Sequence, residues 1–368
     1  MSEVYPKFRA AAVQAAPVFL NREASVEKAC DLIKQAGRGG AQLVALPEVF
    51  IPAYPYWAWL MNIEQGIELC AELYKNSVDV PSETTRRLGQ AAKEAGAYVV
   101  IGVNERDNKS LYNTLLYFDD QGNLIGKHRK FRATHAEKII WGDGDGSTHQ
   151  VFDTKIGRLG GLICGEHTMG LPGYTLGAMG EQVHVASWVG FATAGMPAWA
   201  EAFRTLSETG AKYHAIAYNT FVINVQSIVD QDAINRLGNP PHMKPGGGWT
   251  AIIAPGTGEV IGGPLIDKEG IVYADIDLNT SPAYYFTHEA TGHYWPKSMA
   301  VLFDNQALTP IRYSSPKFEG HAAPSIHQQA KEPWKTTESA VARDEGCEEA
   351  ASLNDRAASG AAEAAVSR

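Results

Sequence analysis

The feature that most constrains the fold of this chain is an alternation of short apolar runs with longer amphipathic segments. It begins at residue 8 and continues for about 280 residues. Runs such as 42–46 and 98–103 are apolar and bounded by Gly, Pro or charged residues, which is typical of buried strands. Segments such as 24–35 and 82–95 place apolar residues at helical spacing. The alternation predicts an α/β or layered α+β domain.

The remaining elements follow the same reading. Further strands are predicted at 8–16, 112–119, 123–127, 158–164, 182–188, 220–229, 249–260 and 271–276, and a long helix at 198–218. A shorter helix is predicted between the strands 158–164 and 182–188. No Pro-, Gly- or Ser-rich break divides this region, and no repeat of 20–50 residues is visible.

Charge and cysteine content exclude several classes of protein. The formal net charge is −9 and no long Lys/Arg run occurs, which argues against nucleic acid as a partner. No apolar run approaches the ~20 residues of a membrane span, and Gln14 and Pro17 interrupt the N-terminal apolar stretch, unlike a signal peptide. The four cysteines are too few and too scattered for a disulfide framework. We therefore expect a cytoplasmic protein with reduced thiols.

One of the four cysteines occupies a position suited to catalysis. Cys164 ends the apolar run 158–163 and is followed at once by Gly165 and polar residues. A strand followed by a turn exposes a nucleophile at the strand end. A cysteine after a strand is also commonly a small buried hydrophobe, so this position alone does not decide.

Three charged residues interrupt apolar surroundings in the same way. Glu48 lies between the strand 42–46 and the run VFIPAYPYW, and a carboxylate there is costly to bury unless it is paired or used. Lys130 follows a predicted strand within GKHRKFR, a type of basic run that usually faces solvent. Glu137 lies in THAEK, where it is also suited to capping a turn.

These four positions resemble the nitrilase superfamily. Glu48 in LPEVFIPAYP, Lys130 in GKHRKF, Glu137 in THAEK and Cys164 in GGLICGEHTM match its Glu–Lys–Glu–Cys set in order and approximate spacing. The resemblance continues through EQVHVASW, the glycine run 246–248, GIVYADID and GHYWP, and covers about residues 8–312. FIPAYPYW and GHYWP are similar to the nitrilase branch more than to its amidase or carbamoylase relatives.

The resemblance implies a reaction and a role for each residue. Cys164 would be the nucleophile, Glu48 the general base, Lys130 the group that stabilises developing charge, and Glu137 a supporting second glutamate. The product would be a carboxylic acid and ammonia, formed through a thioimidate and a thioester, with no metal or cofactor. The substrate-binding residues that we predict are Tyr54, His135, Gly165, Glu166, His167, Trp188 and Phe191.

Gly165 departs from the family pattern, because most nitrilases carry Trp directly after the nucleophile. We expect the glycine to enlarge or loosen the pocket wall beside the thiol. His167 fits the family, in which Asn or His is common at that position.

The resemblance also implies the architecture. It predicts a four-layer α-β-β-α sandwich over residues 1–315, and dimers that extend into spirals or filaments. Residues 316–368 form an Ala-rich tail with few large apolar side chains, so we expect it to be flexible or ordered by a partner, with a docked terminal helix as the alternative.

Other functions remain open from the sequence. An amidase or carbamoyl amidohydrolase would use the same four residues, and cyanide hydration or dihydration would differ only in pocket size. An assembly protein without turnover is favoured only by Gly165. Asp143 and Asp145 resemble the start of an EF-hand loop, but Thr154 occupies its twelfth position, which argues against a metal there.

Overall fold

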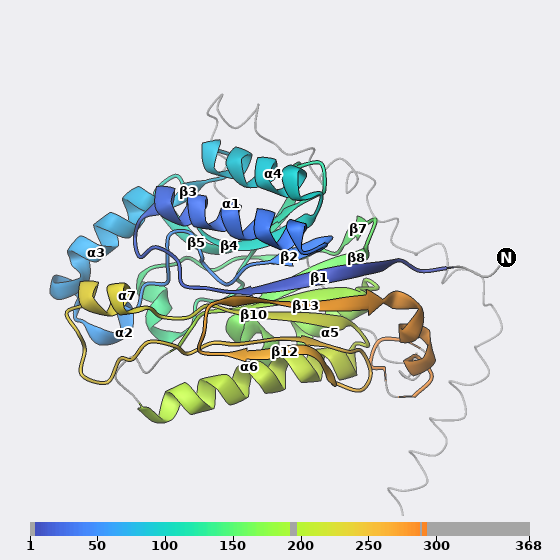
Figure 1. The fold of residues 1–368 in the computed structure, drawn as a ribbon. Helices are drawn as coiled ribbons and strands as arrows, with labels where there is room; N and C mark the ends of the chain where they lie inside the picture. The colour runs from blue at the N-terminus through green and yellow to red at the C-terminus, as the bar shows by residue number, and fades with distance from the viewer. Residues whose placement is uncertain (1–3, 192–196, 288, 293–368) are drawn as a thin grey trace, which may run out of the picture. The chain divides into compact units, whose positions relative to one another are not determined.

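Two β-sheets form the centre of the computed structural model, which describes residues 4–191, 197–287 and 289–292 (Figure 1). The first sheet has the strand order β13-β1-β2-β4-β5-β6, with β3 paired to β4. Strands β1, β2 and β4 are parallel, whereas β13, β5 and β6 are each antiparallel to their neighbours. Its strands are β1 (Lys7–Gln14), β2 (Leu43–Ala45), β3 (Val78–Asp79), β4 (Tyr98–Asp107), β5 (Ser110–Phe118), β6 (Leu124–Arg129) and β13 (Gly270–Asp277).

The second sheet has the order β12-β11-β10-β9-β8-β7. It repeats the plan of the first, because a parallel centre of β8, β9 and β10 is flanked by antiparallel strands. Its strands are β7 (Phe152–Thr154), β8 (Gly157–Ile163), β9 (Val183–Trp188), β10 (Phe221–Gln226), β11 (Trp249–Ile253) and β12 (Val260–Ile266).

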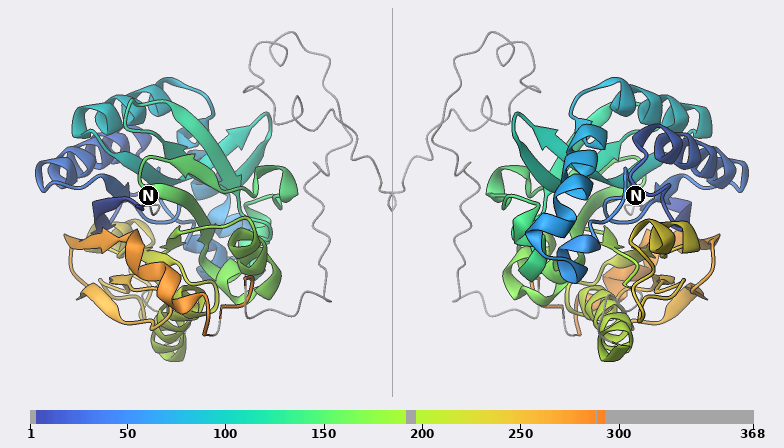
Figure 2. Two further views of the ribbon diagram at one scale, coloured as in Figure 1. Left: turned by 90° about the vertical axis from the view of Figure 1, so that its right-hand side faces the viewer. Right: turned by 90° about the vertical axis from the view of Figure 1, so that its left-hand side faces the viewer.

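Helices cover the outer faces of both sheets. Helices α1 (Arg22–Arg38) and α4 (Glu83–Ala95) lie over the first sheet, and α6 (Pro197–Ala217) lies over the second, as Figures 1 and 2 show. Helix α5 (Gly170–Ala178) packs against β8. These layers confirm the predicted α-β-β-α sandwich.

Successive side chains of β1 pack alternately into two separate hydrophobic cores. Ala10 and Ala12 face the second sheet and belong to the core between the sheets, whereas Ala11 and Val13 join the core beneath α1 and α4. Alternation of side chains along a strand produces this division. Every one of these residues is apolar because both faces of the strand are buried. Each fully buried Val, Leu or Ile side chain stabilises the fold by about 1.5–3 kcal/mol relative to an exposed one.

Three helices were not predicted from the sequence, namely α2 (Trp57–Leu60), α3 (Ile63–Asn76) and α7 (Gln231–Arg236). The single strand predicted over 249–260 is wrong. Gly256 and Gly258 have positive φ angles of 67° and 68°, and this turn separates β11 from β12. In the described part of the chain, no helix is both long and apolar enough to cross a membrane. The predicted tail, residues 316–368, lies outside the described residues.

Candidate active site

The end of β8 presents Cys164 in a strained turn. Cys164 begins the 3-10 helix Cys164–Thr168 and has a φ of 51°, in a region that costs a residue other than glycine about 1–3 kcal/mol. Two hydrogen bonds hold the turn. The backbone N–H of Ile163 donates to Glu166 Oε2 at 2.7 Å, and His167 Nδ1 lies 2.8 Å from the Cys164 carbonyl oxygen. A strained backbone conformation that several contacts hold in place is common at catalytic residues.

Glu48 reaches the same region from the end of β2. The segment that carries it crosses β4 at Gly102, whose N–H donates to the Pro47 carbonyl at 3.1 Å. A Cβ atom at position 102 would lie 2.3 Å from the Val49 nitrogen, so only glycine permits this approach. The side chain of Glu48 is buried as a result.

Lys130 joins Glu48 to Glu137. Its Nζ donates to Glu48 Oε1 at 3.0 Å and to Glu137 Oε2 at 2.9 Å, and all three side chains are buried. Glu137 lies in the 3-10 helix His135–Ile139, where its Oε2 also accepts from the Thr134 N–H at 2.8 Å. Each cation or anion in the cluster therefore has a close partner, as buried charges require.

The two oxygens of Glu48 differ in their contacts. Oε1 accepts from Lys130 and from Asn113 Nδ2, the latter at 2.7 Å. Oε2 is buried and has no hydrogen-bond partner among the described residues. A buried acceptor without a partner is costly, and this oxygen keeps its full capacity to accept a proton. The charge of Glu48 raises the pKa of the Cys164 thiol, so the two groups interact electrostatically.

Burial controls the protonation of this cluster. It raises the pKa of Glu48, as does the nearby charge of Glu137, while Lys130 opposes the shift. Burial, followed by the charge of Glu48, raises the pKa of Cys164 well above its usual range. Burial alone would lower the pKa of Lys130, but Glu137 and Glu48 outweigh it and raise that pKa well above its usual range. The site thus combines a thiol that holds its proton, a carboxylate of increased basicity and a permanent cation.

The sequence matches the Carbon-nitrogen hydrolase family over residues 9–285. The chain belongs to the carbon–nitrogen hydrolase family. Within this family it is similar to a nitrilase from Bacillus sp. (strain OxB-1), with 43% identity over 316 residues, which are 84% of this chain and 91% of that protein.

Two further relatives extend the comparison. An aliphatic nitrilase from Rhodococcus rhodochrous is 37% identical, over 84% of this chain and 86% of that protein. The crystal structure of a carbon–nitrogen hydrolase from Helicobacter pylori G27 matches with a TM-score of 0.62 and 20% identity, over 76% of this chain and 91% of that one. The structural match supports the sandwich fold of the carbon–nitrogen hydrolases.

The polar atoms of Glu166 and His167 are bonded within the protein, and the contact of these residues with substrate stays a prediction. Both oxygens of Glu166 are already used: they accept from the Ile163 and Phe131 N–H groups and lie 3.0 and 3.2 Å from His128 Nε2. Both ring nitrogens of His167 also have protein partners, the Cys164 carbonyl and His184. These two residues hold the nucleophile turn, because their polar atoms are engaged before any substrate arrives.

Three aromatic residues predicted to contact substrate lie close to the cluster or to its supports. The Tyr54 hydroxyl donates to Glu137 Oε1 at 2.8 Å and accepts from Trp59 Nε1 at 2.8 Å. Trp188 is fully buried and stacks on His167, and the Phe191 ring meets that of Trp59 edge-on. Their contact with substrate stays a prediction.

His135 and Gly165 also stay predicted substrate residues. His135 is exposed, with its ring edge-on to Trp59. A Cβ atom at Gly165 would meet only Thr134 Oγ1, at 3.5 Å, so there is room for a side chain beside the nucleophile.

Two hydrogen-bonding residues of the site were missed from the sequence. Asn113 holds Glu48 and lies on β5, and His128 faces Glu166 from β6. Both are buried polar residues within strands. A polar residue at a buried strand position nearly always has a hydrogen-bond partner, so this pattern is the sequence signal for both residues.

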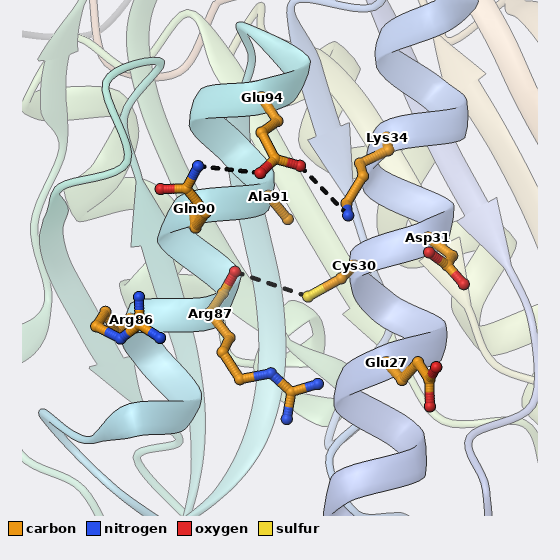
Figure 3. Close-up of a pocket in the computed structure, with 9 residues that line it drawn as sticks. All are labelled: Glu27, Cys30, Asp31, Lys34, Arg86, Arg87, Gln90, Ala91 and Glu94. Carbon is orange, nitrogen blue, oxygen red and sulfur yellow. Dashed lines mark hydrogen bonds and ion pairs between the residues drawn. The ribbon is translucent and has the colours of Figure 1, made fainter.

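The other described cysteines have ordinary surroundings. Cys30 on α1 donates to the Arg87 carbonyl on α4 at 3.7 Å, in a surface hollow lined by charged side chains (Figure 3). Cys70 on α3 accepts from Trp57 Nε1 at 3.2 Å. Cys347 lies outside the described residues. Among the described thiols, only Cys164 is buried together with a carboxylate and an ammonium group that act on it.

Proposed function

We propose that this carbon–nitrogen hydrolase is a nitrilase, which converts an organic nitrile and water to a carboxylic acid and ammonia. One observation carries the proposal: a buried Cys164 on which the charge of Glu48 acts, with Glu48 Oε2 left without a hydrogen-bond partner among the described residues, in a chain 43% identical to a nitrilase. A nitrile carbon is a poor electrophile, so the reaction needs an activated thiol, which is the strongest of the common protein nucleophiles.

The first step forms a covalent bond. Glu48 Oε2 takes the thiol proton of Cys164 as the sulfur attacks the nitrile carbon, and one π bond of the nitrile becomes a lone pair on nitrogen. Protonation of this nitrogen gives a thioimidate. The raised pKa of Glu48 makes its carboxylate a better base for this transfer.

The second half releases both products. Water adds to the thioimidate and gives a tetrahedral intermediate, which expels ammonia and leaves a thioester. A second water then hydrolyses the thioester, releases the acid and regenerates the thiol. Expulsion of the thiolate in place of ammonia would release an amide.

Lys130 and Glu137 act through charge and position. The ammonium of Lys130 stabilises negative charge that develops on the nitrile nitrogen and later on the tetrahedral oxygen. Glu137 fixes the direction of the ammonium through its 2.9 Å ion pair, and Tyr54 fixes Glu137 in turn. No step of this scheme requires a metal or a cofactor.

A product assay tests the proposal against the amidase alternative. The purified protein is incubated with aliphatic, arylacetic and aromatic nitriles, with cyanide, and with the amide of each nitrile, and ammonia, acid and amide are quantified separately. We expect acid and ammonia from at least one organic nitrile. Ammonia from amides or carbamoyl compounds alone would overturn the proposal, and turnover of cyanide alone would replace it with cyanide hydration or dihydration.

We also propose that the nitrilase works in the cytoplasm as a homo-oligomer, a dimer that builds spirals or filaments. A reducing compartment suits an enzyme whose nucleophile is a thiol. The assembly rests on the family resemblance.

A further inference from the structure

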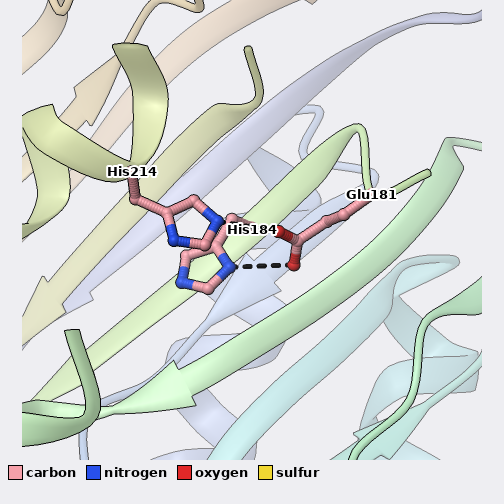
Figure 4. A group of neighbouring side chains, drawn as sticks. All are labelled: Glu181, His184 and His214. Carbon is pink, nitrogen blue, oxygen red and sulfur yellow. Dashed lines mark hydrogen bonds and ion pairs between the residues drawn. The ribbon is translucent and has the colours of Figure 1, made fainter. Parts of the chain in front are cut away.

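A second buried cluster of titratable groups lies behind the nucleophile. Glu181 precedes β9, His184 lies on β9 and His214 on α6, and all three side chains are buried (Figure 4). His184 Nδ1 is 2.8 Å from Glu181 Oε1, and His214 Nε2 is 2.8 Å from Glu181 Oε2. The proposed mechanism uses none of these groups.

The cluster has the donor types of a metal site, and it is the one such group among the described residues. Its geometry does not suit one. The rings of His184 and His214 stack with centroids 3.6 Å apart, and each directs a nitrogen at a different oxygen of Glu181. A zinc ion needs lone pairs that converge on one point about 2.0–2.1 Å away. Stacked rings direct their lone pairs side by side, so the contacts are hydrogen bonds.

A chain of these bonds leads to Cys164. His184 Nε2 lies 3.0 Å from His167 Nε2, and His167 Nδ1 lies 2.8 Å from the Cys164 carbonyl oxygen. A carbonyl can only accept, so His167 Nδ1 donates to it. The Nε2 of a neutral His167 then accepts, which makes His184 Nε2 the donor.

The assignment of donors and acceptors also determines the protonation state of Glu181. A neutral His184 that donates from Nε2 has a lone pair on Nδ1, so Glu181 Oε1 must carry the proton between them. Its other oxygen accepts from His214 Nε2. The alternative is a buried ion pair of an ionised Glu181 and a doubly protonated His184, whose removal from water is costly.

Burial favours the neutral arrangement. It raises the pKa of Glu181, and it lowers the pKa values of His184, His214 and His167 to about 3. These shifts leave three neutral imidazoles at neutral pH, and the hydrogen-bond directions given above then require Glu181 to be a carboxylic acid.

We propose that Glu181, as a carboxylic acid, begins a one-directional chain of hydrogen bonds through His184 and His167 that holds the carbonyl of Cys164 and so positions the nucleophile. The turn at Cys164 has a φ of 51° and persists only if its surroundings restrain it. Glu166 restrains the residue before the nucleophile, and the chain restrains the nucleophile itself. The three residues are positioning residues, and their effect on nitrile turnover rests on the proposed function.

Glu181→Gln and Glu181→Leu form a matched pair that tests the chain. A glutamine can donate from its amide nitrogen to His184 Nδ1 and accept from His214 with its oxygen, as the carboxylic acid does. Leucine has a similar size and can do neither. We expect Glu181→Gln to keep kcat within about threefold of the wild type, and Glu181→Leu to lower kcat about tenfold or more with a smaller change in KM.

The rate at which iodoacetamide alkylates Cys164, followed by peptide mass spectrometry, gives a second readout. It requires no nitrile turnover, so it separates this proposal from the proposed function. We expect the same order: wild type and Glu181→Gln fast, Glu181→Leu slow. A glutamine variant as slow as the leucine variant, or a leucine variant as fast as the wild type, would overturn the proposal.

If Glu181→Leu does not fold, nitrogen-15 NMR of the wild-type protein with labelled histidines tests the proposal by showing which ring nitrogens of His184 carry a proton. The proposal expects a His184 Nδ1 without a proton and a protonated Nε2. A His184 protonated on both nitrogens would contradict the neutral chain and the acid form of Glu181.

Discussion

The contacts of the two carboxylate oxygens of Glu48 suit its proposed role as the general base. Lys130 and Asn113 occupy its Oε1 and fix the carboxylate in place, while its Oε2 is left without a partner. A carboxylate held by one oxygen and free at the other can receive a proton without moving. Preorganisation of this kind reduces the reorganisation that the reaction requires.

Glu48→Gln should remove the base and keep the structure. The amide oxygen can still accept from Lys130 and Asn113, so we expect a folded protein. Loss of the proton acceptor should lower kcat about 10²- to 10⁴-fold. Steady-state ammonia release measures the effect. Glu83→Gln on the exposed start of α4 is the matched control and should leave kcat unchanged. Activity retained by Glu48→Gln would show that another group takes the thiol proton.

Gly165→Trp should change which nitriles are accepted. Only Thr134 Oγ1 lies within 4 Å of the added Cβ, so the first atom of the side chain meets no clash, and we expect the indole to reduce the space beside the thiol. We expect kcat/KM for an arylacetic nitrile to fall about tenfold relative to that for a small aliphatic nitrile. Gly170→Trp, at an exposed and open position, controls for the size of the substitution. An unchanged ratio would mean that position 165 does not border the substrate.

The sequence allowed the principal residues of the site to be predicted but not their partners. Glu48 and Cys164 stand out because a charged or reactive group follows an apolar run, whereas Lys130 lies in a basic run and was identified through the family resemblance. The hydrogen bond between Tyr54 and Glu137 joins residues 83 positions apart, and no local pattern reports such a contact. The contacts of Glu166 with Phe131 and His128, 35 and 38 positions away, could not be predicted for the same reason.

Among the elements, β6 positions Lys130, which directly follows this strand at the edge of the first sheet. Glu105 on β4 ties this strand down. Its carboxylate accepts from Arg129 at 2.7 and 2.8 Å and from Thr114 on β5 at 2.8 Å, and it pairs with Lys127. The strand is thereby joined to the centre of the first sheet, next to the proposed catalytic residue Lys130.

This tie should make stability depend on pH. Burial would raise the pKa of Glu105, but Arg129 and Lys127 outweigh it and lower that pKa to about 2, from 4.5. A lowered pKa contributes stability above pH 4.5 and loses it as the pH falls toward 2. We expect Glu105→Gln to lower the free energy of unfolding by about 2 kcal/mol at pH 7, and by much less near pH 3.

Chemical denaturation of both proteins at each pH measures that difference. Asp275→Asn serves as a control, because its ion pair with Arg9 is exposed and should contribute little at either pH. A gap between Glu105→Gln and the wild type that stays constant from pH 7 to pH 3 would contradict the role given to Glu105.

Strands were easier to predict than the helices near the site. Buried central strands such as β4 are apolar on both faces and are evident in the sequence. Helix α3 was not predicted. Two of its large apolar residues, Ile63 and Ile67, are exposed, so its apolar positions do not form a face that packs against the described structure. Its capping box at Asn62 and Gln65 is the signal that was available.

At the scale of the whole molecule, the active site exists only when the two sheets are packed together. The first sheet supplies Glu48 and Lys130 from the ends of β2 and β6, and the second supplies Cys164 from the end of β8. Neither sheet alone contains both base and nucleophile. The site is therefore complete only in the packed sandwich.

The tail should affect assembly more than chemistry. Residues beyond Tyr313 include few large apolar side chains and none of the proposed catalytic residues. We expect truncation after Tyr313 to change particle size, measured by light scattering, more than turnover per Cys164 site. The full chain at equal concentration is the control. Unchanged size with reduced turnover would place the tail in the site's function.

The covalent intermediate on Cys164 is the most direct test of the central claim. The protein is mixed with a substrate nitrile, quenched in acid within the first turnovers, digested and examined by mass spectrometry. We expect an added mass, equal to the nitrile or its acyl group, on the peptide that contains Cys164, and neither adduct nor acid product with Cys164→Ala. Nitrile turnover by Cys164→Ala, or an adduct on a different residue, would contradict it.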